Sequence, residues 1–553
     1  MNETISCDVA IVGGGPTGST VGSLLKLQNP ELDVRIFESK SFPRDHVGES
    51  LLPTACSVLH ETGAWEKVEG AGFPVKLGGL YRWGSTNDVY SLKFLRGASY
   101  EDAPRPAKYE GQRTLTAFQV DRGSFDKILL DHAAELGCQV HSSCPVVSVA
   151  KSGDRVESLR VQSVGDRSES EVVADHYIDA SGTRAILRRA LDVPVSVPTS
   201  LRNIAIYGYW RNANWGDRAG QDGTHIYVMS LDWGWLWFIV IGNDRTSVGL
   251  VTSAAHYKQS KTTPEELYAR AIAEEPSISH LLSDATLEGA LRADRDWSFV
   301  ADRLSGENWF LAGDSGGFAD PILSAGITLA MSGARKVAYT MSELRRGEHD
   351  PAWLKQEYDR SHRASIRDHI RFADYWYSVN AKFTDLKEYC AEIARDSGLI
   401  LNADQAFQWL GTGGFAGDAG GFESPTAATF RLSTVKSMVE TLGGGSSGWR
   451  FFRHKGLRLN LAGAERETCA TYYQGRVVPQ ESYRRGAARF FLEGFYKRAY
   501  LSLLAEHSTP AVVERMFLYF RKRSTLPDEA LKTIIFEVLE ALYLSGWIEP
   551  MPG

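Results

Sequence analysis

The sequence predicts a mixed α/β (α+β) fold, with an antiparallel sheet interleaved into its first part and a mainly helical C-terminal part. Three observations predict this fold. An apolar strand, a glycine-rich turn and a helix follow one another at the start, in CDVAIVGGGPTGSTVGSLLKL. Strand-like segments concentrate in two regions, about 75–120 and 195–300. After residue 345 the pattern changes to aromatic residues at helical spacing. We therefore divide the chain into 1–345 and 346–553.

Composition and charge narrow the class of protein. Of 553 residues, 43% are hydrophobic and 23% are charged, as in ordinary globular proteins, and the formal net charge of −7 argues against nucleic acid as a partner. No apolar run is long enough to span a bilayer, and the N-terminus enters a strand without a signal-peptide pattern. The six cysteines form neither CxxC nor a zinc-binding spacing. We expect a cytoplasmic protein with reduced thiols, no metal and no membrane partner.

The first strand–turn–helix carries a dinucleotide-binding pattern. Gly13, Gly15 and Gly18 form G-x-G-x-x-G, in which the glycines allow a tight turn, a close approach of pyrophosphate and close helix packing. The next strand, in DVRIFES, ends at Glu38, twenty residues after Gly18. An acidic residue there can accept hydrogen bonds from ribose hydroxyls. This combination predicts a Rossmann-like nucleotide domain.

Distant segments favour FAD over NAD. A strand ending at Asp179 opens a turn in YIDASGTRAILRRAL, and NWFLAGDSGGFADP carries Gly313-Asp314. Arg122 begins a predicted helix in VDRGSFDKILLDHAAELG. Three segments that return to one nucleotide resemble the FAD-dependent monooxygenases with the p-hydroxybenzoate hydroxylase fold. The resemblance covers about residues 5 to 345.

Further stretches resemble the flavin-dependent halogenases. They are FPRDHVGESLLP (42–53), FPVKLGGLYRWG (73–84) with Lys76, the aromatic strand DWGWLWFIVIG (232–242), and FADPILSAG (318–326), which is F-x-x-P-x-x-S-x-G. Trp235 and Trp237 fit the family's W-x-W-x-I-P strand, but Val240 stands where the family has proline. This departure leaves the local backbone open.

The resemblance implies an oxidoreductase that uses reduced FAD, oxygen and a chloride or bromide ion to make hypohalous acid. A separate flavin reductase supplies the reduced FAD by diffusion, since no second G-x-G-x-x-G is present for a nicotinamide cofactor. Backbone N–H groups in the turn at Ser324, Ala325 and Gly326 would hold the halide, although an ordinary helix start facing the flavin is the plain alternative. The residues expected to bind FAD are Gly13, Gly15, Gly18, Glu38, Arg44, Glu49, Arg122, Asp179, Gly313, Asp314, Pro321, Gly326 and Ile327.

The same resemblance assigns the chemistry to Lys76. Its amine would carry the hypohalous acid to the substrate, and partial desolvation would lower its pKa. Trp235 and Trp237 lie two residues apart on one strand, so they share a face and would separate substrate from flavin. Without the resemblance, a lone lysine is usually an exposed surface residue and paired tryptophans are usually core.

The substrate class follows from one position in the turn. Halogenases of free tryptophan carry glutamate before the motif's serine, and here that residue is Leu323, which cannot accept a proton. The sequence therefore resembles the branch that acts on electron-rich phenolic, pyrrolic or acyl substrates, often attached to carrier proteins, in antibiotic or other natural-product biosynthesis. We expect the helical part, 346–553, to cap the substrate cavity, to dock a carrier protein or only to support the FAD domain.

Three other functions stay open. An FAD-dependent aromatic hydroxylase of the same fold would insert oxygen whatever the halide, and Lys76 with the tryptophan pair argues against it. A flavin reductase of isoprenoid double bonds also carries similar Gly-Asp segments. A non-catalytic flavoprotein scaffold would only bind a carrier-protein assembly, and Val240 is the sequence feature that favours it.

Overall fold

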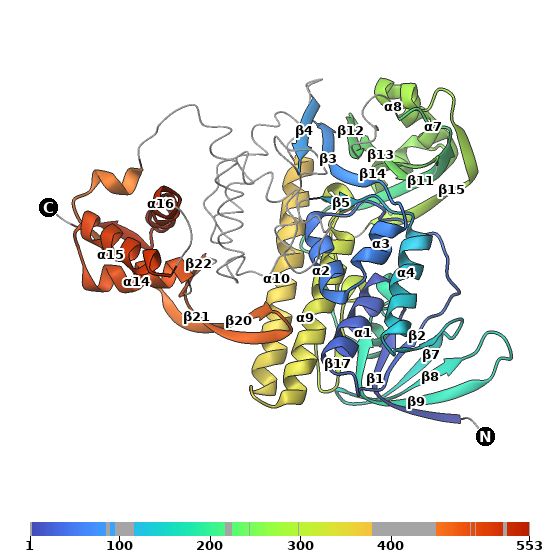
Figure 1. Cartoon of the computed structure of the whole chain (residues 1–553). Coiled ribbons are helices and arrows are strands. Elements are labelled where there is room, and N and C mark those ends of the chain that lie inside the picture. Colours follow the sequence, from blue (N-terminus) through green and yellow to red (C-terminus); the bar gives the residue numbers. More distant parts are fainter. Residues whose placement is uncertain are drawn as a thin grey trace. The chain divides into compact units, whose positions relative to one another are not determined.

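The computed structural model describes residues 3–378 and 449–551, apart from 84–88, 95–115, 216–223, 243, 297, 487, 493 and 524–527. The chain divides into two compact units. The first contains the described residues up to 378, and the second contains those from 449 onward (Figure 1). The first unit contains both helices and strands, and the predicted mixed α/β class is confirmed. The predicted sheet-rich region 75–120 lies partly outside the described residues.

A seven-stranded sheet forms the nucleotide side of the first unit. Its central strand β1 (Glu3–Val12) is parallel to β2 (Val34–Phe37) on one side and to β9 (Glu169–Asp179) on the other. The near-continuous apolar run at the end of β1 is buried on both faces, as expected for a parallel strand between helices. The sheet is completed by β6 (Gln139–His141), β7 (Val146–Ser152), β8 (Arg155–Gln162) and β17 (Trp309–Leu311).

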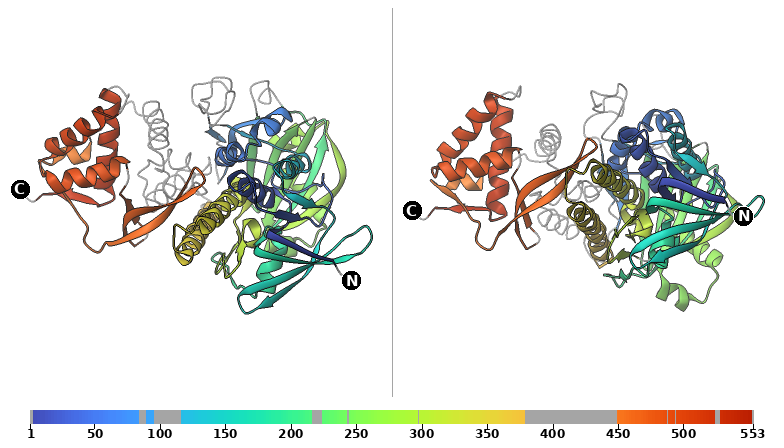
Figure 2. Two further views of the ribbon diagram at one scale, coloured as in Figure 1. Left: turned by 60° about the horizontal axis from the view of Figure 1, so that its bottom comes forward. Right: turned by 90° about the horizontal axis from the view of Figure 1, so that it is seen from below.

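Long helices cover this sheet. Helix α1 (Pro16–Gln28) packs against α9 (Gly326–Arg346) and α4 (Arg122–Glu135). Asp121 caps α4 because its carboxylate accepts from Ser124 N–H at 3.0 Å. Helix α10 (Pro351–Ser378) returns along α9, and Figures 1 and 2 show the two helices side by side. The boundary predicted after residue 345 differs from the structure, because α10 belongs to the same compact unit as α9.

An eight-stranded, mainly antiparallel sheet forms the other layer of the first unit. Its order is β15-β11-β14-β13-β12-β3-β4, with β5 paired to β3. One face packs against α7 (Pro264–Glu274) and α8 (Pro276–Leu281) around a core that includes Leu236, Phe238 and Val240. The strands are β3 (Val75–Arg82), β4 (Val89–Lys93), β5 (Ala117–Phe118), β11 (Asn203–Arg211), β12 (Thr224–Leu231), β13 (Gly234–Gly242), β14 (Arg245–Ser253) and β15 (Thr286–Asp296).

Short elements connect the two layers. A three-stranded sheet has the order β10-β16-β18, and its strand β18 lies shortly before α9 in the chain. The remaining described elements of this unit are α2 (Pro53–Thr62), α3 (Trp65–Gly70), α5 (Ile186–Ala190), α6 (Ala254–Ser260), β10 (Val195–Ser196), β16 (Phe299–Ala301), β18 (Gly317–Phe318) and the 3-10 turns η1 (Gly182–Arg184), η2 (Gly313–Ser315) and η3 (Pro321–Leu323).

The described part of the second unit has its own apolar core of helices and strands. Three helices, α14 (Gly494–Ala505), α15 (Thr509–Arg521) and α16 (Asp528–Leu544), pack on one another. Strands β20 (Glu465–Tyr473), β21 (Arg476–Arg485) and β22 (Ala488–Phe491) form an antiparallel sheet, and β19 (Leu457–Leu459) pairs with β23 (Ile548–Pro550) after the turn η4 (Arg450–Arg453). None of the helices in the described ranges is both long and apolar enough to cross a membrane.

Substitution of Gly18 tests the closeness of α1 to the first turn. A Cβ at Gly18 would lie 1.9 Å from Gly13 O, so Gly18→Ala must push the helix away. We expect a loss of about 1–3 kcal/mol in stability and a lower unfolding midpoint in calorimetry. Gly70→Ala is the matched control, because Gly70 lies in helix α3 with nothing within 4 Å of its Cβ position. Equal midpoints for the two variants would contradict the close contact.

Candidate functional site

The glycine-rich turn after β1 is shaped to receive a phosphate. Gly13 has φ +106°, a conformation that favours glycine, and Gly18 lies directly against its carbonyl. The N-terminal end of α1 therefore lies at the C-terminal end of β1, where its free N–H groups and dipole attract an anion. A Cβ at Gly15 would lie 3.6 Å from Arg44 Nη2, so this guanidinium lies beside the turn. These contacts bring together Arg44 and the three predicted glycines.

Glu38 occupies the end of β2, as the sequence predicts. Its side chain is almost fully buried. One carboxylate oxygen accepts from Gly14 N–H at 2.8 Å and the other accepts from Lys40 N–H at 2.9 Å. The oxygen bound to Lys40 N–H also accepts from Ser39 Oγ at 3.2 Å. The oxygen bound to Gly14 N–H has a second lone pair, so Glu38 can still accept from a ribose hydroxyl beside the turn.

Arg122 holds the loop that follows β2. Its guanidinium forms a two-point ion pair with Asp126, at 2.7 and 2.9 Å, and donates to Val47 O at 2.7 Å. Arg44 also approaches Asp126, with 3.7 Å between Nη1 and Oδ2. The carboxylate of Asp126 is inaccessible to solvent, and the two arginines share it. Loop 42–50 is therefore fixed to the start of α4.

A second set of ion pairs fixes the same loop to the large sheet. Asp45 accepts from Arg292 Nη2 at 2.6 Å and lies 3.3 Å from Arg245 Nη2. Partial burial alone would raise the pKa of Asp45, but the hydrogen bond from Arg292 and the charge of Arg245 lower it overall. The guanidinium groups of Arg245 and Arg292 also lie over the Tyr209 ring, at 3.9 and 5.4 Å from its centroid respectively.

The structure places Asp179 differently from a direct cofactor ligand. Its carboxylate accepts from Ser181 N–H and Oγ–H, and from the N–H groups of Leu187 and Arg188, at 2.6–3.1 Å. The side chain is fully buried. It therefore caps the turn after β9 and the start of α5. Its carbonyl accepts from Ser315 Oγ at 2.6 Å, which ties β9 to the Gly-Asp turn.

The Gly-Asp turn lies against the start of α1. Gly313 has φ +63°, and a Cβ there would lie 2.4 Å from Thr17 Oγ1. Burial raises the pKa of the Asp314 carboxyl to about 6, while the charge of Arg122 opposes this shift. Asp314 is only half-buried from solvent, so a cofactor hydroxyl can reach it. Three segments that are far apart in the sequence thus meet beside the glycine-rich turn.

The predicted halide turn forms a helix start with free N–H groups. Ser324 has φ +58°, and its N–H donates to Pro321 O at 2.8 Å. Helix α9 then begins, and Leu329 N–H donates to Ala325 O at 2.8 Å. Within the described part of the chain, the N–H groups of Ala325, Gly326 and Ile327 have no acceptor, as is usual at a helix start. This geometry can accommodate a small anion.

The tryptophan pair lies on the face of the large sheet opposite α7 and α8. Trp235 and Trp237 are 2% and 5% exposed, and their rings lie 6.0 Å apart. Trp237 Nε1 donates to Ser247 Oγ at 3.1 Å, and its ring covers Gly249 on the neighbouring strand. Val240 pairs with Thr246 in the same ladder and packs into the core on the other face. Valine therefore continues the strand at the position where the family has proline.

Lys76 lies on the same face of this sheet as Trp237. On β12, Thr224 pairs with Lys76 and Val228 pairs with Trp237. Thr224 and Val228 are four residues apart, so strand alternation places them, and their partners Lys76 and Trp237, on one face of the sheet. The Lys76 side chain is 1% exposed, and Nζ donates to Leu51 O at 3.0 Å. Burial lowers the pKa of this amine to about 7. The expected desolvated lysine is present.

Glu49 joins loop 42–50 to the tryptophan face. Its carboxylate accepts from Tyr209 Oη at 3.0 Å and from Ser247 Oγ at 3.4 Å, and Ser247 in turn accepts from Trp237 Nε1. Burial raises the pKa of Glu49 to about 7, against the hydrogen bond from Tyr209. Sequence reasoning proposed Glu49 for FAD but missed Tyr209 and Ser247, because their residue types have no motif of their own.

A second missed group lies at the halide turn. Asp320 accepts from Ile322 N–H at 2.9 Å and from Asn203 Nδ2 at 3.0 Å. It also accepts from Tyr377 Oη at 3.1 Å. The Asp-Pro pair before the turn is a recognisable cap signal for Asp320. Tyr377 has no such signal, because its helical spacing with other aromatic residues is typical of core.

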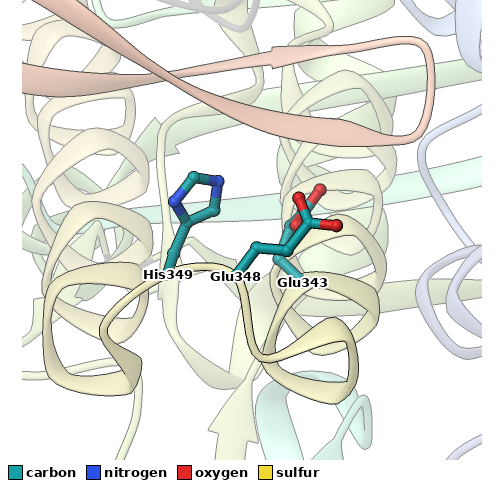
Figure 3. A group of neighbouring side chains, drawn as sticks. All are labelled: Glu343, Glu348 and His349. Carbon is teal, nitrogen blue, oxygen red and sulfur yellow. The ribbon is translucent and has the colours of Figure 1, made fainter.

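One group of potential metal ligands occurs among the described residues. Glu343, Glu348 and His349 each have one ligand atom within 4.8 Å of the others, at the turn between α9 and α10 (Figure 3). The Glu343 carboxylate is ion-paired with Arg346 at 2.9 Å. A guanidinium in this position competes with a cation for the carboxylate, so the group does not indicate a metal centre.

Comparison with known proteins identifies the family. A model of the FAD binding domain matches residues 6–373. A tryptophan 2-halogenase of Chondromyces crocatus is 30% identical over 409 residues, 73% of this chain and 74% of its own. A 1H-pyrrole-2-carbonyl-(peptidyl-carrier protein) chlorinase of Pseudomonas fluorescens is 30% identical over 388 residues, 68% of this chain and 85% of its own. The chain belongs to the flavin-dependent halogenases.

Solved halogenase structures share the fold. The myxobacterial chondrochloren halogenase CndH has a TM-score of 0.61 and 25% identity, covering 74% of this chain and 97% of its own. The halogenase CmlS has a TM-score of 0.72 and 23% identity, covering 99% and 96%. The resemblance inferred from the sequence is confirmed at the level of family, fold and FAD cofactor.

The residues of this halogenase fit FAD. The close Gly13–Gly18 contact, the opening at Gly15 and the nearby Arg44 suit a pyrophosphate, and Glu38 suits a ribose. When bound in its reduced form, FAD reacts with oxygen and thereby supplies the oxidising power that halogenation requires. The protein orients this cofactor, offers N–H groups at the start of α9 and buries an amine on the large sheet. Halogenases of this family generally obtain reduced FAD from a separate flavin reductase.

The buried amine predicts a pH-dependent stability. The pKa of Lys76 is about 7 in the folded state and 10.5 in the unfolded chain, so the unfolded chain alone gains a proton as the pH falls between these values. Folding stability therefore falls over this window. We expect Lys76→Met to raise the unfolding midpoint relative to wild type, and by more at pH 7 than at pH 9.5. Lys258→Met, at an exposed lysine, is the control for loss of one charge. An advantage that does not change with pH would contradict the assignment.

Proposed function

We propose that Lys76 delivers hypohalous acid to the organic substrate. The supporting observation is a fully buried amine that donates to Leu51 O, on the same face of the sheet as Trp237. A lysine amine has three hydrogen atoms when charged and a lone pair when neutral. With a pKa of about 7, both forms are present at neutral pH. The charged amine can donate a hydrogen bond to hypohalous acid. The neutral amine can attack the chlorine of hypochlorous acid, which breaks the O–Cl bond and forms a chloramine and water.

The halide and barrier residues complete this proposal. The turn Ser324–Ala325–Gly326 holds chloride or bromide by the backbone N–H groups of Ala325 and Gly326, since the N–H of Ser324 donates to Pro321 O. Desolvating a halide is costly unless donors replace its water. Trp235 and Trp237 separate the substrate from the flavin. The resulting path runs from the halide turn, past the tryptophan face, to Lys76. A monooxygenase that hydroxylates its substrate directly has no use for this separation.

We further propose a phenolic, pyrrolic or acyl substrate, supplied free or on a carrier protein, in a natural-product pathway. Leu323 provides no carboxylate at the turn, so the substrate must itself stabilise the charge that halogenation creates. The named relatives point in several directions, since one is a tryptophan 2-halogenase, one acts on a carrier-bound pyrrole and one is a sulochrin halogenase of Aspergillus terreus. Tryptophan is therefore the alternative that the substrate assay must include.

Lys76→Met separates formation of the oxidant from its delivery. With reduced FAD, oxygen and bromide, we expect the variant to bind FAD as wild type does and to release hypobromous acid that a soluble scavenger traps. Product from the organic substrate should fall about 100-fold or more, because the reagent is no longer held beside it. Lys258→Met is the control. Product within about three-fold of wild type would contradict the role of Lys76.

A substrate panel tests the class. We expect halogenated products from a phenol, a pyrrole or an acyl group, attached to a carrier protein or free. We expect none from free tryptophan, because Leu323 offers no proton acceptor at the position before Ser324. Mass spectrometry with chloride and then bromide identifies the halogen in each product. Efficient halogenation of tryptophan would contradict the substrate class. A product that gains only oxygen with either halide would instead favour the hydroxylase.

A further inference from the structure

The hydroxyl of Tyr377 connects the tryptophan face to the halide turn. Tyr377 lies near the C-terminal end of α10. Trp235 Nε1 donates to Tyr377 Oη at 2.8 Å, and Oη donates to Asp320 Oδ1 at 3.1 Å. A hydroxyl has one proton and two lone pairs, so it can serve both partners at once.

Asp320 passes this connection to the turn itself. Its side chain is 3% exposed, and its Oδ1 also accepts from Ile322 N–H, which caps the 3-10 turn η3 that ends just before Ser324. Asn203 Nδ2 holds the other carboxylate oxygen at 3.0 Å. Tyr377 and Asn203 thus fix the Asp320 carboxylate through its two different oxygens.

The turn needs such support because its backbone is strained. Ser324 has φ +58°, in the left-handed region, which costs an L-residue other than glycine about 1–2 kcal/mol. The direction of the next N–H groups, those of Ala325 and Gly326, depends on this conformation. A shift of Asp320 would therefore reorient the donors proposed to bind the halide.

The same helix end also holds the aromatic side. Trp83 Nε1 donates to Trp376 O at 3.0 Å, and the Trp83 ring lies 5.8 Å from the Tyr377 ring. Trp83 also lies 6.5 Å from Trp235. We call Trp83 and Trp235 the aromatic wall. The last described turn of α10 therefore contacts both the aromatic wall and the halide turn.

We propose that Tyr377 is a positioning residue that couples the aromatic wall to the halide turn and sets halide affinity. This rests on the proposed function in one respect, that Ser324, Ala325 and Gly326 hold the halide. Tyr377 acts through Asp320 and does not itself touch the halide. Removing its hydroxyl leaves Asp320 with fewer donors and Trp235 without its acceptor. The Asp320 carboxylate and the Trp235 indole are then held less firmly in position.

Tyr377→Phe tests this coupling without turnover. Bromide is titrated into the oxidised, FAD-loaded protein, and binding is followed by the change in flavin absorbance. We expect the dissociation constant for bromide to rise about five- to ten-fold, as for loss of one partly buried hydrogen bond, with FAD affinity unchanged. In turnover, KM for chloride should rise while kcat at saturating chloride is retained.

Tyr268→Phe is the matched control. The Tyr268 hydroxyl also accepts from an indole, Trp210 Nε1 at 2.9 Å, and donates to Val248 O at 3.0 Å, but on the opposite face of the large sheet. Its loss should lower stability without changing bromide affinity. Equal bromide affinity in both variants, or a fall in kcat with KM unchanged, would overturn the role of Tyr377.

Asn203→Ala keeps the proposal testable if Tyr377→Phe does not fold. It removes the hydrogen bond to Oδ2 of Asp320 and should also weaken bromide binding several-fold. If it leaves bromide affinity unchanged, the coupling through Asp320 is wrong. A different experiment tests the proposed halide site itself. If wild-type crystals soaked in bromide show no anomalous peak at Ser324–Gly326, the halide site is wrong whatever the role of Tyr377. A peak at that turn with unchanged affinity in Tyr377→Phe overturns only the role of Tyr377.

Discussion

The close contact between Gly18 and the carbonyl of Gly13 is the constraint on which the first unit depends. It brings α1 directly against the end of β1, and α1 then packs on α9 and supports the Gly-Asp turn through Thr17. The start of α9 is the candidate halide turn. The glycine-rich turn, the Gly-Asp turn and the candidate halide turn are therefore all positioned by α1, which packs directly on its strand because Gly18 has no side chain.

The two faces of the large sheet differ in their contacts and side chains. One face is an ordinary apolar core with α7 and α8, and Val240 belongs to it. The other face carries Trp235, Trp237 and Lys76 and receives Glu49 from loop 42–50. Strand alternation permits this division, because neighbouring residues point to opposite sides. The departure from the family's proline falls on the core face and leaves the aromatic face intact.

Local sequence patterns predicted local structure well. The glycine fingerprint, the acid at Glu38 and the helix start at Arg122 lie where their spacing indicates, and family resemblance located Lys76, which burial confirms as an unusual lysine. Asp179 was harder, because an acidic residue at a strand end looks the same whether it binds a cofactor or caps a helix. The link from Trp235 through Tyr377 to Asp320 could not be predicted, since these partners lie 142 and 57 residues apart and only the tertiary fold brings them together.

The ion pairs of Asp45 make the attachment of loop 42–50 sensitive to the concentration of the halide itself. The halide is a reactant and also an electrolyte. Asp45 is 33% exposed and Arg292 is 42% exposed, so dissolved salt screens their attraction. A higher chloride concentration supplies more of the reactant and at the same time weakens the ion pairs that attach loop 42–50 to the large sheet. Saturation and ionic strength are thus inseparable variables for this enzyme unless a non-coordinating salt keeps the second constant.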